Sequence, residues 1–340
     1  MNNIHLSICI PTYNFGKFIG ETLESLLPQL TPNVEIVIFD GGSTDNTANI
    51  VERYLSNSLQ IRYIIQNFRG GIDADMHRSV EHAAGEYCWL FSSDDVMKKT
   101  SIEQILTEIE LSLDVYLCGF DLYSFDLNNF LGKHSISSIE NAVTINFASE
   151  NERKAYFQKA STSTAFFSFM SSLIVKRRRW LETALDEKFF GTCWAHVARI
   201  FNMIPNGLKV KYLPASLLMK RHFNDSFMDK GLVHRLGIAI DGYHQIADCF
   251  FGFDSPEAYH IRRVIRNEIT IRLILKAKES AKTKIEKRRL CVLIGKLYCD
   301  TLPSRIIFTL IARLLHPKLC YFITICYLSM KRSLNWLRKT

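Results

Sequence analysis

Short apolar segments alternate with amphipathic ones through the first 95 residues, and this alternation constrains the fold more than any other feature. Four apolar segments predict strands, at residues 6–10, 34–39, 61–65 and 87–91. Three segments with apolar residues at helical spacing lie between them, at residues 18–27, 43–55 and 75–84. This order is typical of an α/β fold, in which helices flank a mostly parallel sheet.

A cluster of polar residues follows each predicted strand. The clusters occupy residues 12–14, 40–45, 69–75 and 92–95. Because ligands bind at the carboxyl ends of the strands in open α/β sheets, we expect the four clusters to line one binding site. No G-x-G-x-x-G follows the first strand, and no G-x-x-x-x-G-K-[ST] is present. The sequence therefore disfavours a dinucleotide-dependent dehydrogenase and a P-loop enzyme.

The carboxylates in these clusters point to a nucleotide and a cation. Two adjacent carboxylates, Asp94 and Asp95, repel each other unless a cation compensates them, and a divalent metal can bridge them to a diphosphate. A solvated turn before a helix is the alternative. Asp40, followed by two glycines, can accept hydrogen bonds from a nucleobase or ribose, or it can belong to a plain turn. Asp73 and Asp75 could form a second wall of the pocket.

The charge of the chain is distributed unevenly. Residues 261–340 carry 19 Lys and Arg against 4 Asp and Glu, whereas residues 1–260 carry 23 against 30. Such a basic end predicts contact with an anionic surface, either membrane or nucleic acid. The longest apolar stretch there, residues 319–330, is shorter than the roughly 20 residues that span a bilayer. An amphipathic segment lying on the membrane surface is the favoured interpretation, with ordinary packing on the catalytic core as the alternative.

Cysteine usage favours a reducing compartment. The nine cysteines include no C-x-x-C pair, which argues against a disulfide framework and a zinc finger. The first five residues lead directly into the first predicted strand without the apolar region of a signal peptide. These features predict a cytoplasmic protein.

Taken in order, the segments resemble family 2 glycosyltransferases of the GT-A fold over roughly residues 5–225. The matching stretches are SICIPTYN from residue 7, IVIFDGGSTDNT from residue 36, GGIDAD from residue 70 and GEYCWLFSSDD from residue 85. Within that family the pattern most resembles bacterial O-antigen transferases of the abequosyltransferase type. The resemblance implies a GT-A catalytic domain over residues 1–228, with a nucleotide-binding half (1–100) and an acceptor half (101–228). A helical, basic region would follow at residues 229–340.

The resemblance also implies roles for individual residues. Asp95 is the expected direct metal ligand, assisted by Asp94 and His222, and the ion would be Mn²⁺ or Mg²⁺. Ser92 stands where the family's motif usually has a first Asp, which leaves the ion with few carboxylates. The residues expected to bind the nucleotide sugar are Pro11, Thr12, Tyr13, Asn14, Asp40, Gly71, Asp73, Asp75, Ser93, Asp94 and Arg221.

The general base departs from the family pattern as well. The family usually places a Glu-Asp pair at the start of a helix after the acceptor-site strand, but residues 190–199 contain no carboxylate. His196 is the nearest group that can take a proton near neutral pH, and Asp186 or Glu187 is the alternative. Cys193 is not expected to act as a nucleophile, because a single direct displacement needs no covalent intermediate.

These expectations describe an inverting glycosyltransferase. It would move a sugar from a nucleotide-diphosphate donor to a hydroxyl of a lipid-linked surface polysaccharide or O-antigen intermediate. It would lie at the cytoplasmic face of a bacterial membrane, held by its basic C-terminal region, and it would not bind nucleic acid. A sugar-nucleotidyltransferase is one alternative, although this chain lacks the Gly-rich basic loop that such an enzyme is expected to have after its first strand. A non-catalytic scaffold that binds nucleic acid through the tail is the other.

Overall fold

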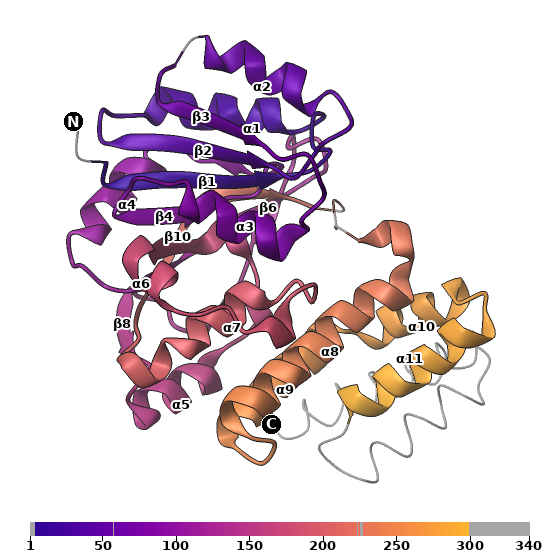
Figure 1. The fold of residues 1–340 in the computed structure, drawn as a ribbon. Helices are drawn as coiled ribbons and strands as arrows, with labels where there is room; N and C mark the ends of the chain where they lie inside the picture. The colour runs from indigo at the N-terminus through magenta and orange to yellow at the C-terminus, as the bar shows by residue number, and fades with distance from the viewer. Residues whose placement is uncertain (1–3, 57, 223, 225–226, 299–340) are drawn as a thin grey trace. The chain divides into compact units, whose positions relative to one another are not determined.

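A computed structural model describes residues 4–56, 58–222, 224 and 227–298 of the chain (Figure 1). Two compact units are present, Met1–Asn224 and Asp225–Thr340. Their division lies close to the domain boundary expected from the sequence after residue 228.

The first half of the sheet in unit 1 is parallel, as the sequence predicted. Its order is β3-β2-β1-β4, and every neighbouring pair runs parallel. All residues of β1 and β2 are buried, which fits central strands covered on both faces. The four strands are β1 (Leu6–Thr12), β2 (Val34–Asp40), β3 (Ile61–Ile65) and β4 (Tyr87–Leu90).

The second half of the sheet mixes parallel and antiparallel pairs. It continues β4-β9-β6-β10-β5, with β7 added to β6 and β8 added to β10. β10 is 13 residues long, and its last residues, Lys220 and Arg221, pair beside β6. These strands are β5 (Val96–Met97), β6 (Val115–Tyr123), β7 (Phe130–Lys133), β8 (Val143–Asn146), β9 (Leu173–Lys176) and β10 (Lys209–Arg221).

The three helices expected in the first 95 residues are present as α1, α2 and α3, with shifted starts. α2 begins at Thr47 and not at residues 43–44, because Ser43 and Thr44 bond to Asn14. α3 begins three residues earlier than expected, after Gly71 with a φ of 87°, and packs on β1 and β2. The helices are α1 (Ile19–Leu26), α2 (Thr47–Leu55), α3 (Ile72–Glu81), α4 (Ser101–Ile109), α5 (Glu150–Lys159), α6 (Arg177–Glu182) and α7 (Ala195–Asn202).

Unit 2 is helical in its described part, which confirms the pattern seen in the sequence. α8 (Leu232–Phe251) contacts α9 (Pro256–Glu268), α10 (Ile271–Ser280) and α11 (Lys284–Leu297). Side-chain caps fix three of the starts: Ser255 caps α9, Thr270 caps α10, and Thr283 forms a capping box with Glu286 at α11. No helix in the described residues is both long and apolar enough to cross a membrane. The apolar stretch at residues 319–330 lies outside them.

Candidate functional site

The carboxyl ends of β1, β2 and β4 lie side by side, so the polar segments that follow them meet at one edge of the sheet. Thr12 at the end of β1 is in register with Asp40 at the end of β2, and Pro11 pairs with Phe39. On the other side of β1, Phe91 donates a backbone hydrogen bond to Cys9 at 2.9 Å, immediately before residues 92–95.

Hydrogen bonds join the segment after β1 to the segment after β2. Asn14, in the left-handed region at φ 58°, accepts from the backbone N–H of Thr44 at 2.7 Å through Oδ1. Its own N–H donates to Ser43 Oγ at 2.8 Å. Beside it, the Arg69 guanidinium lies 4.4 Å from the centroid of the Tyr13 ring. The Asn14 side chain therefore shapes the loop, while Tyr13 and Arg69 form a stacked cation–π pair at the edge of the sheet.

Asp40 is 1% exposed and has partners on both carboxylate oxygens. Oδ1 accepts from the backbone N–H of Ser43 at 2.7 Å, and Oδ2 accepts from the Tyr63 hydroxyl at 2.6 Å. Burial, and then the hydrogen bond to Asp40, raise the pKa of Tyr63, so its hydroxyl stays a donor. Next to Asp40, the buried Thr12 Oγ1 has no hydrogen-bond partner in the described residues, an unusual state that a ligand would resolve.

Asp75 joins the same cluster from the start of α3. Its Oδ1 accepts from Gln66 Nε2 at 2.8 Å. A Cβ placed on Gly41 would lie 2.4 Å from Asp75 Oδ2, and one placed on Gly70 would lie 2.6 Å from Oδ1, so both glycines are needed to admit the carboxylate. Burial raises the pKa of Asp75 to about 6, and the charge of Asp40 adds to the effect. Gln66 Oε1 is buried without a partner in the described part of the chain.

Asp73, only two residues earlier, points elsewhere. It is 6% exposed and accepts from the backbone N–H groups of Cys193 at 3.0 Å and Ala195 at 3.2 Å. Burial raises the pKa of Asp73, and these amide donors oppose the shift. Cys193 has a φ of 72°. Asp73 thus caps the start of α7 from a distance and holds the loop in which the sequence placed the general base.

The two carboxylates after β4 differ in exposure. Asp95 is 1% exposed, and its Oδ2 accepts from Ser171 Oγ at 2.5 Å. Burial and the charge of Asp94 raise the pKa of Asp95 well above its usual value. Asp94 is only half-buried, and it accepts from Ser92 Oγ and from Asn224 Nδ2, the latter at 2.6 Å. Asp94 is therefore the carboxylate of the pair that is open to solvent.

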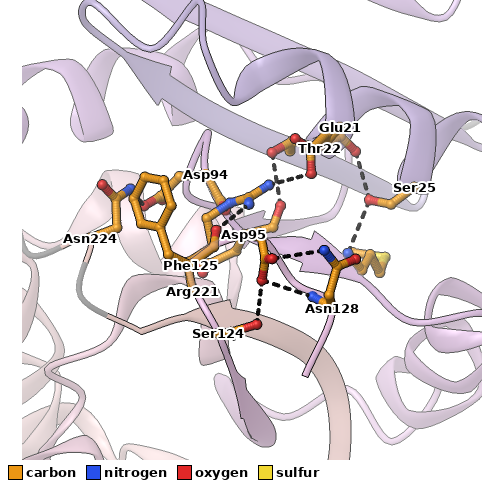
Figure 2. A network of polar contacts seen from close by, with 12 residues as sticks. Glu21, Thr22, Ser25, Asp94, Asp95, Ser124, Phe125, Asn128, Arg221 and Asn224 are labelled. Atoms are coloured by element: carbon orange, nitrogen blue, oxygen red, sulfur yellow. Dashed lines mark hydrogen bonds and ion pairs between the residues drawn. The ribbon is translucent and has the colours of Figure 1, made fainter. Parts of the chain in front are cut away.

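One side of α1 holds the backbone that carries these carboxylates (Figure 2). Thr22 Oγ1 donates to the carbonyl oxygen of Asp95 at 2.8 Å, and Ser25 Oγ accepts from the N–H of Met97 at 3.0 Å. Thr22 is fully buried. Thr22 and Ser25 are polar residues on the otherwise apolar face of residues 18–27. They were a signal in the sequence for this contact, which the sequence analysis did not predict.

Arg221 lies beneath Asp94 and is 4% exposed (Figure 2). Nε donates to the carbonyl oxygen of Asp94 at 2.8 Å and Nη1 to that of Phe125 at 2.9 Å. Nη2 forms an ion pair with Glu21 at 2.6 Å. Every guanidinium nitrogen is thus bonded within the protein, and the arrangement positions Asp94.

Three further residues were expected to bind the donor or the metal. Ser93 is buried between Ser92 and Asp94. Gly71 stands at the start of α3. His222 is exposed, and its backbone N–H donates to the carbonyl oxygen of Tyr123 at 2.8 Å. Within the described residues, no three His, Cys, Asp or Glu side chains gather closely enough to hold a metal ion by themselves.

The three candidate bases differ in their surroundings. His196 is 5% exposed; Nε2 pairs with the carbonyl oxygen of Phe167 at 3.0 Å, while Nδ1 has no partner in the described part of the chain. Because a carbonyl only accepts, Nε2 carries the proton and Nδ1 keeps a lone pair. Burial lowers the pKa of His196 to about 4, so the ring is neutral. Asp186 accepts from the N–H of Lys188 at 3.1 Å, and Glu187 is exposed.

Comparison with known proteins places these features in a family. The sequence model of "Glycosyl transferase family 2" matches residues 7–178. Abequosyltransferase RfbV of Salmonella typhimurium is 30% identical over 299 residues, which cover 87% of this chain and 90% of that protein. Glycosyltransferase GlyG of Streptococcus pneumoniae is 32% identical over 126 residues, 37% of this chain and 42% of that protein.

Solved structures share the fold. The crystal structure of S. aureus TarS in complex with UDP-GlcNAc superposes with a TM-score of 0.61 at 18% identity, covering 91% of this chain and 87% of that chain. The mannosyltransferase PcManGT from Pyrobaculum calidifontis, in complex with GDP-Man and Mn²⁺, gives a TM-score of 0.54 at 14% identity, with 92% and 86% covered. These likenesses confirm the expected GT-A type α/β architecture.

Proposed function

Because the chain belongs to glycosyl transferase family 2, and is therefore a glycosyltransferase, we propose that it transfers a sugar from a nucleotide-diphosphate donor to a hydroxyl of a lipid-linked surface polysaccharide intermediate, with inversion. The observation that carries the proposal is the meeting of Tyr13, Asp40 and Asp94 at one edge of the sheet, each at the end of a different parallel strand. The family favours this reading over the sugar-nucleotidyltransferase and scaffold alternatives.

In this proposal the cluster at the ends of β1 and β2 binds the nucleoside. The unpartnered oxygens of Thr12 and Gln66 and the carboxylate of Asp40 offer hydrogen bonds to a base or ribose. Tyr13, held by Arg69, offers an aromatic face. Asp75 positions Gln66 by accepting a hydrogen bond from its Nε2. Asp73 is not included among the donor contacts, because its oxygens bond the backbone at the start of α7.

A divalent ion, Mn²⁺ or Mg²⁺, fits the carboxylates after β4 in partnership with the donor. Such ions are held in nucleotide sites by one or two carboxylates together with phosphate oxygens, which suits a site without a third ligating side chain. Asp94, as the more exposed carboxylate, would hold the ion, with Asp95 behind it. His222 would assist, since it directly follows Arg221, which bonds the backbone carbonyl of Asp94. A cation there would relieve the repulsion between Asp94 and Asp95. When bound, the ion neutralises charge on the diphosphate.

We propose His196 as the group that accepts the proton of the acceptor hydroxyl. Its neutral ring with a lone pair on Nδ1 has the required protonation state at neutral pH. Because its pKa is low, proton transfer would accompany attack and departure of the nucleoside diphosphate. Asp73 would act as a positioning residue, since it fixes the backbone of Cys193 and Ala195 directly before His196.

We also propose that the enzyme lies at the cytoplasmic face of a membrane, and the exposed residues of unit 2 support contact with a membrane surface. Two apolar side chains of α11 point outward: Ile285 is 80% exposed and Val292 is 54% exposed. The basic residues Lys284, Lys287 and Arg288 on the same helix are exposed as well. Apolar residues set among basic ones suit the boundary between anionic headgroups and acyl chains.

Turnover of sugar nucleotides tests the proposed activity. Release of nucleoside diphosphate would be measured with UDP-, GDP-, CDP- and TDP-sugars, in Mn²⁺, with bacterial glycolipid extract as the source of acceptor. We expect acceptor-dependent release with one class of donor and loss of that release in Asp94→Asn. Release of pyrophosphate from a nucleoside triphosphate and a sugar phosphate, with no activity on the sugar nucleotides, would contradict the proposal.

A further inference from the structure

Lys220 is an unneutralised cation at the end of β10, beside Arg221. Its ammonium lies 4.7 Å from the centroid of the Phe169 ring and 5.9 Å from that of Phe120, and the side chain is partly exposed. Neither a hydrogen bond nor an ion pair joins the Lys220 ammonium to any residue that the structure describes. Aromatic faces attract a cation and orient it without cancelling its charge.

Three other cations of unit 1, by contrast, are neutralised. Lys98 forms an ion pair with Asp121, and Arg221 forms one with Glu21. Further along the same strand, Lys211 forms an ion pair with Glu108 at 2.5 Å. Of these four side chains Lys220 alone has its charge available to a ligand. A partly buried cation without a counter-ion is costly, and an anionic ligand would remove that cost.

The surroundings link Lys220 to the carboxylates after β4. Phe169, under the ammonium, lies two residues before Ser171, and Ser171 Oγ bonds Asp95. Arg221, the next residue along β10, bonds the backbone carbonyl of Asp94. The second ring near the ammonium, Phe120, stacks on His134 at 4.3 Å. Lys220 is therefore joined to the segment of Asp94 and Asp95 through the residues on both of its sides.

We propose that Lys220 binds the diphosphate of the donor and stabilises the charge that develops on it as the sugar leaves, an inference that rests on the function proposed above. The bond between the anomeric carbon and the diphosphate oxygen breaks, and its electron pair stays with the nucleoside diphosphate. The acceptor oxygen forms the new bond, and its proton passes to the general base. Lys220 remains protonated throughout and contributes electrostatic stabilisation.

Lys220, and not Arg221, is then the cation that binds the donor. Arg221 has all its nitrogens committed to Asp94, Phe125 and Glu21 and cannot reach a phosphate without giving up those bonds. Successive residues of a strand face opposite sides of the sheet, so the two cations do different work although they are adjacent.

Calorimetry with diphosphates and monophosphates of each nucleoside tests this assignment. UDP, GDP, CDP and TDP would be titrated in Mn²⁺ beside the matching monophosphates, on wild type, Lys220→Met, Lys220→Gln and Lys220→Arg. We expect both neutral variants to bind the diphosphate about tenfold or more weakly, with monophosphate binding unchanged, and kcat to fall roughly 100-fold. Lys220→Arg should recover part of the loss. Lys211→Met, on the same strand but paired with Glu108, is the matched control and should bind like wild type.

Three results would overturn the inference. The first is wild-type diphosphate affinity in Lys220→Met and Lys220→Gln. The second is an equal loss for mono- and diphosphates, which would place Lys220 at the nucleoside. The third is a raised KM for acceptor alone, which would assign the cation to an acceptor phosphate. A wild-type protein that binds no nucleotide at all would refute the proposed function itself, so the two failures are distinguishable.

Discussion

The Arg221 guanidinium donates from Nε to the backbone carbonyl of Asp94 at 2.8 Å, while its Nη2 forms an ion pair with Glu21 of α1 at 2.6 Å. A residue at the end of β10 thereby ties the segment that carries Asp94 and Asp95 to the first helix of the chain. Thr22 and Ser25 of α1 bond the same segment. The geometry of the carboxylates consequently depends on contacts between parts of the chain that are far apart in sequence.

Replacement of Arg221 tests this support. Arg221→Met removes three hydrogen bonds from a buried position, and we expect it to lower the free energy of unfolding by about 1.5–3 kcal/mol. Glu21→Gln should cost less than Arg221→Met, because Glu21 is half-exposed and the Gln side-chain oxygen can still accept from Arg221 Nη2. Urea unfolding measures both. Unchanged stability in Arg221→Met, with weakened diphosphate binding, would instead favour the direct donor contact expected from the sequence.

Asp73 is expected to act on the acceptor side. In Asp73→Asn one of the two acceptor oxygens for Cys193 and Ala195 becomes an amide donor. We therefore expect nucleoside diphosphate affinity to stay near wild type, while kcat falls about tenfold or more because the loop before His196 is misplaced. Hydrogen exchange should speed up at the amides of Cys193 and Ala195. Weaker nucleotide binding, with those amides still protected from exchange, would contradict this prediction and indicate that Asp73 contacts the donor.

Asp75 should make stability depend on pH. Its folded pKa of about 6 lies above the ordinary value, so the folded state favours the protonated carboxyl, and that stabilisation is lost as pH rises through about 6. Asn at this position stays neutral and can still accept from Gln66. We therefore expect the free energy of unfolding of Asp75→Asn to gain on wild type between about pH 4 and pH 7. Urea unfolding across this range measures the difference; a difference independent of pH would contradict it.

The outward face of α11 should bind anionic membranes. Wild-type protein would be sedimented with vesicles of phosphatidylcholine, with and without phosphatidylglycerol, and we expect binding only to the anionic vesicles, weakening with salt. Ile285→Asp combined with Val292→Asp should abolish it. Leu59→Asp, which alters an even more exposed apolar residue in unit 1, is the control and should leave binding intact. Equal binding of the wild type and the double variant would remove α11 from the membrane contact.

The first four strands and their ligand-binding edge were predictable from the sequence because hydrophobic periodicity and chain order determine them locally. The directions of individual side chains were not. Asp73 and Asp75 are two residues apart on a helix and so project to different sides. Only the position of α7 decides that Asp73 caps it while Asp75 joins Asp40.

The contacts of Lys220 and Arg221 could not be predicted for the same reason. Alternation along β10 predicts that they face opposite ways, but the neighbours on each face come from α1 and from the segment around Phe169. Ser171, Gln66 and Tyr63 were likewise missed, since each pairs with a carboxylate that lies on a different element of the fold. The polar residues Thr22 and Ser25 on α1 were the one local signal of such a contact.

The most direct test of the central claim is calorimetric titration of the purified chain with UDP, GDP, CDP and TDP, with and without Mn²⁺, beside Asp94→Asn and Asp95→Asn. We predict that one nucleotide binds tightly only in Mn²⁺, and that Asp94→Asn abolishes the metal dependence while unfolding at the wild-type temperature. Asp95→Asn should keep the wild-type unfolding temperature or raise it, because the Asn oxygen can still accept from Ser171 Oγ and the repulsion from Asp94 is removed. Failure of every nucleotide to bind, with or without metal, would contradict the assignment of this site to a nucleotide-sugar donor.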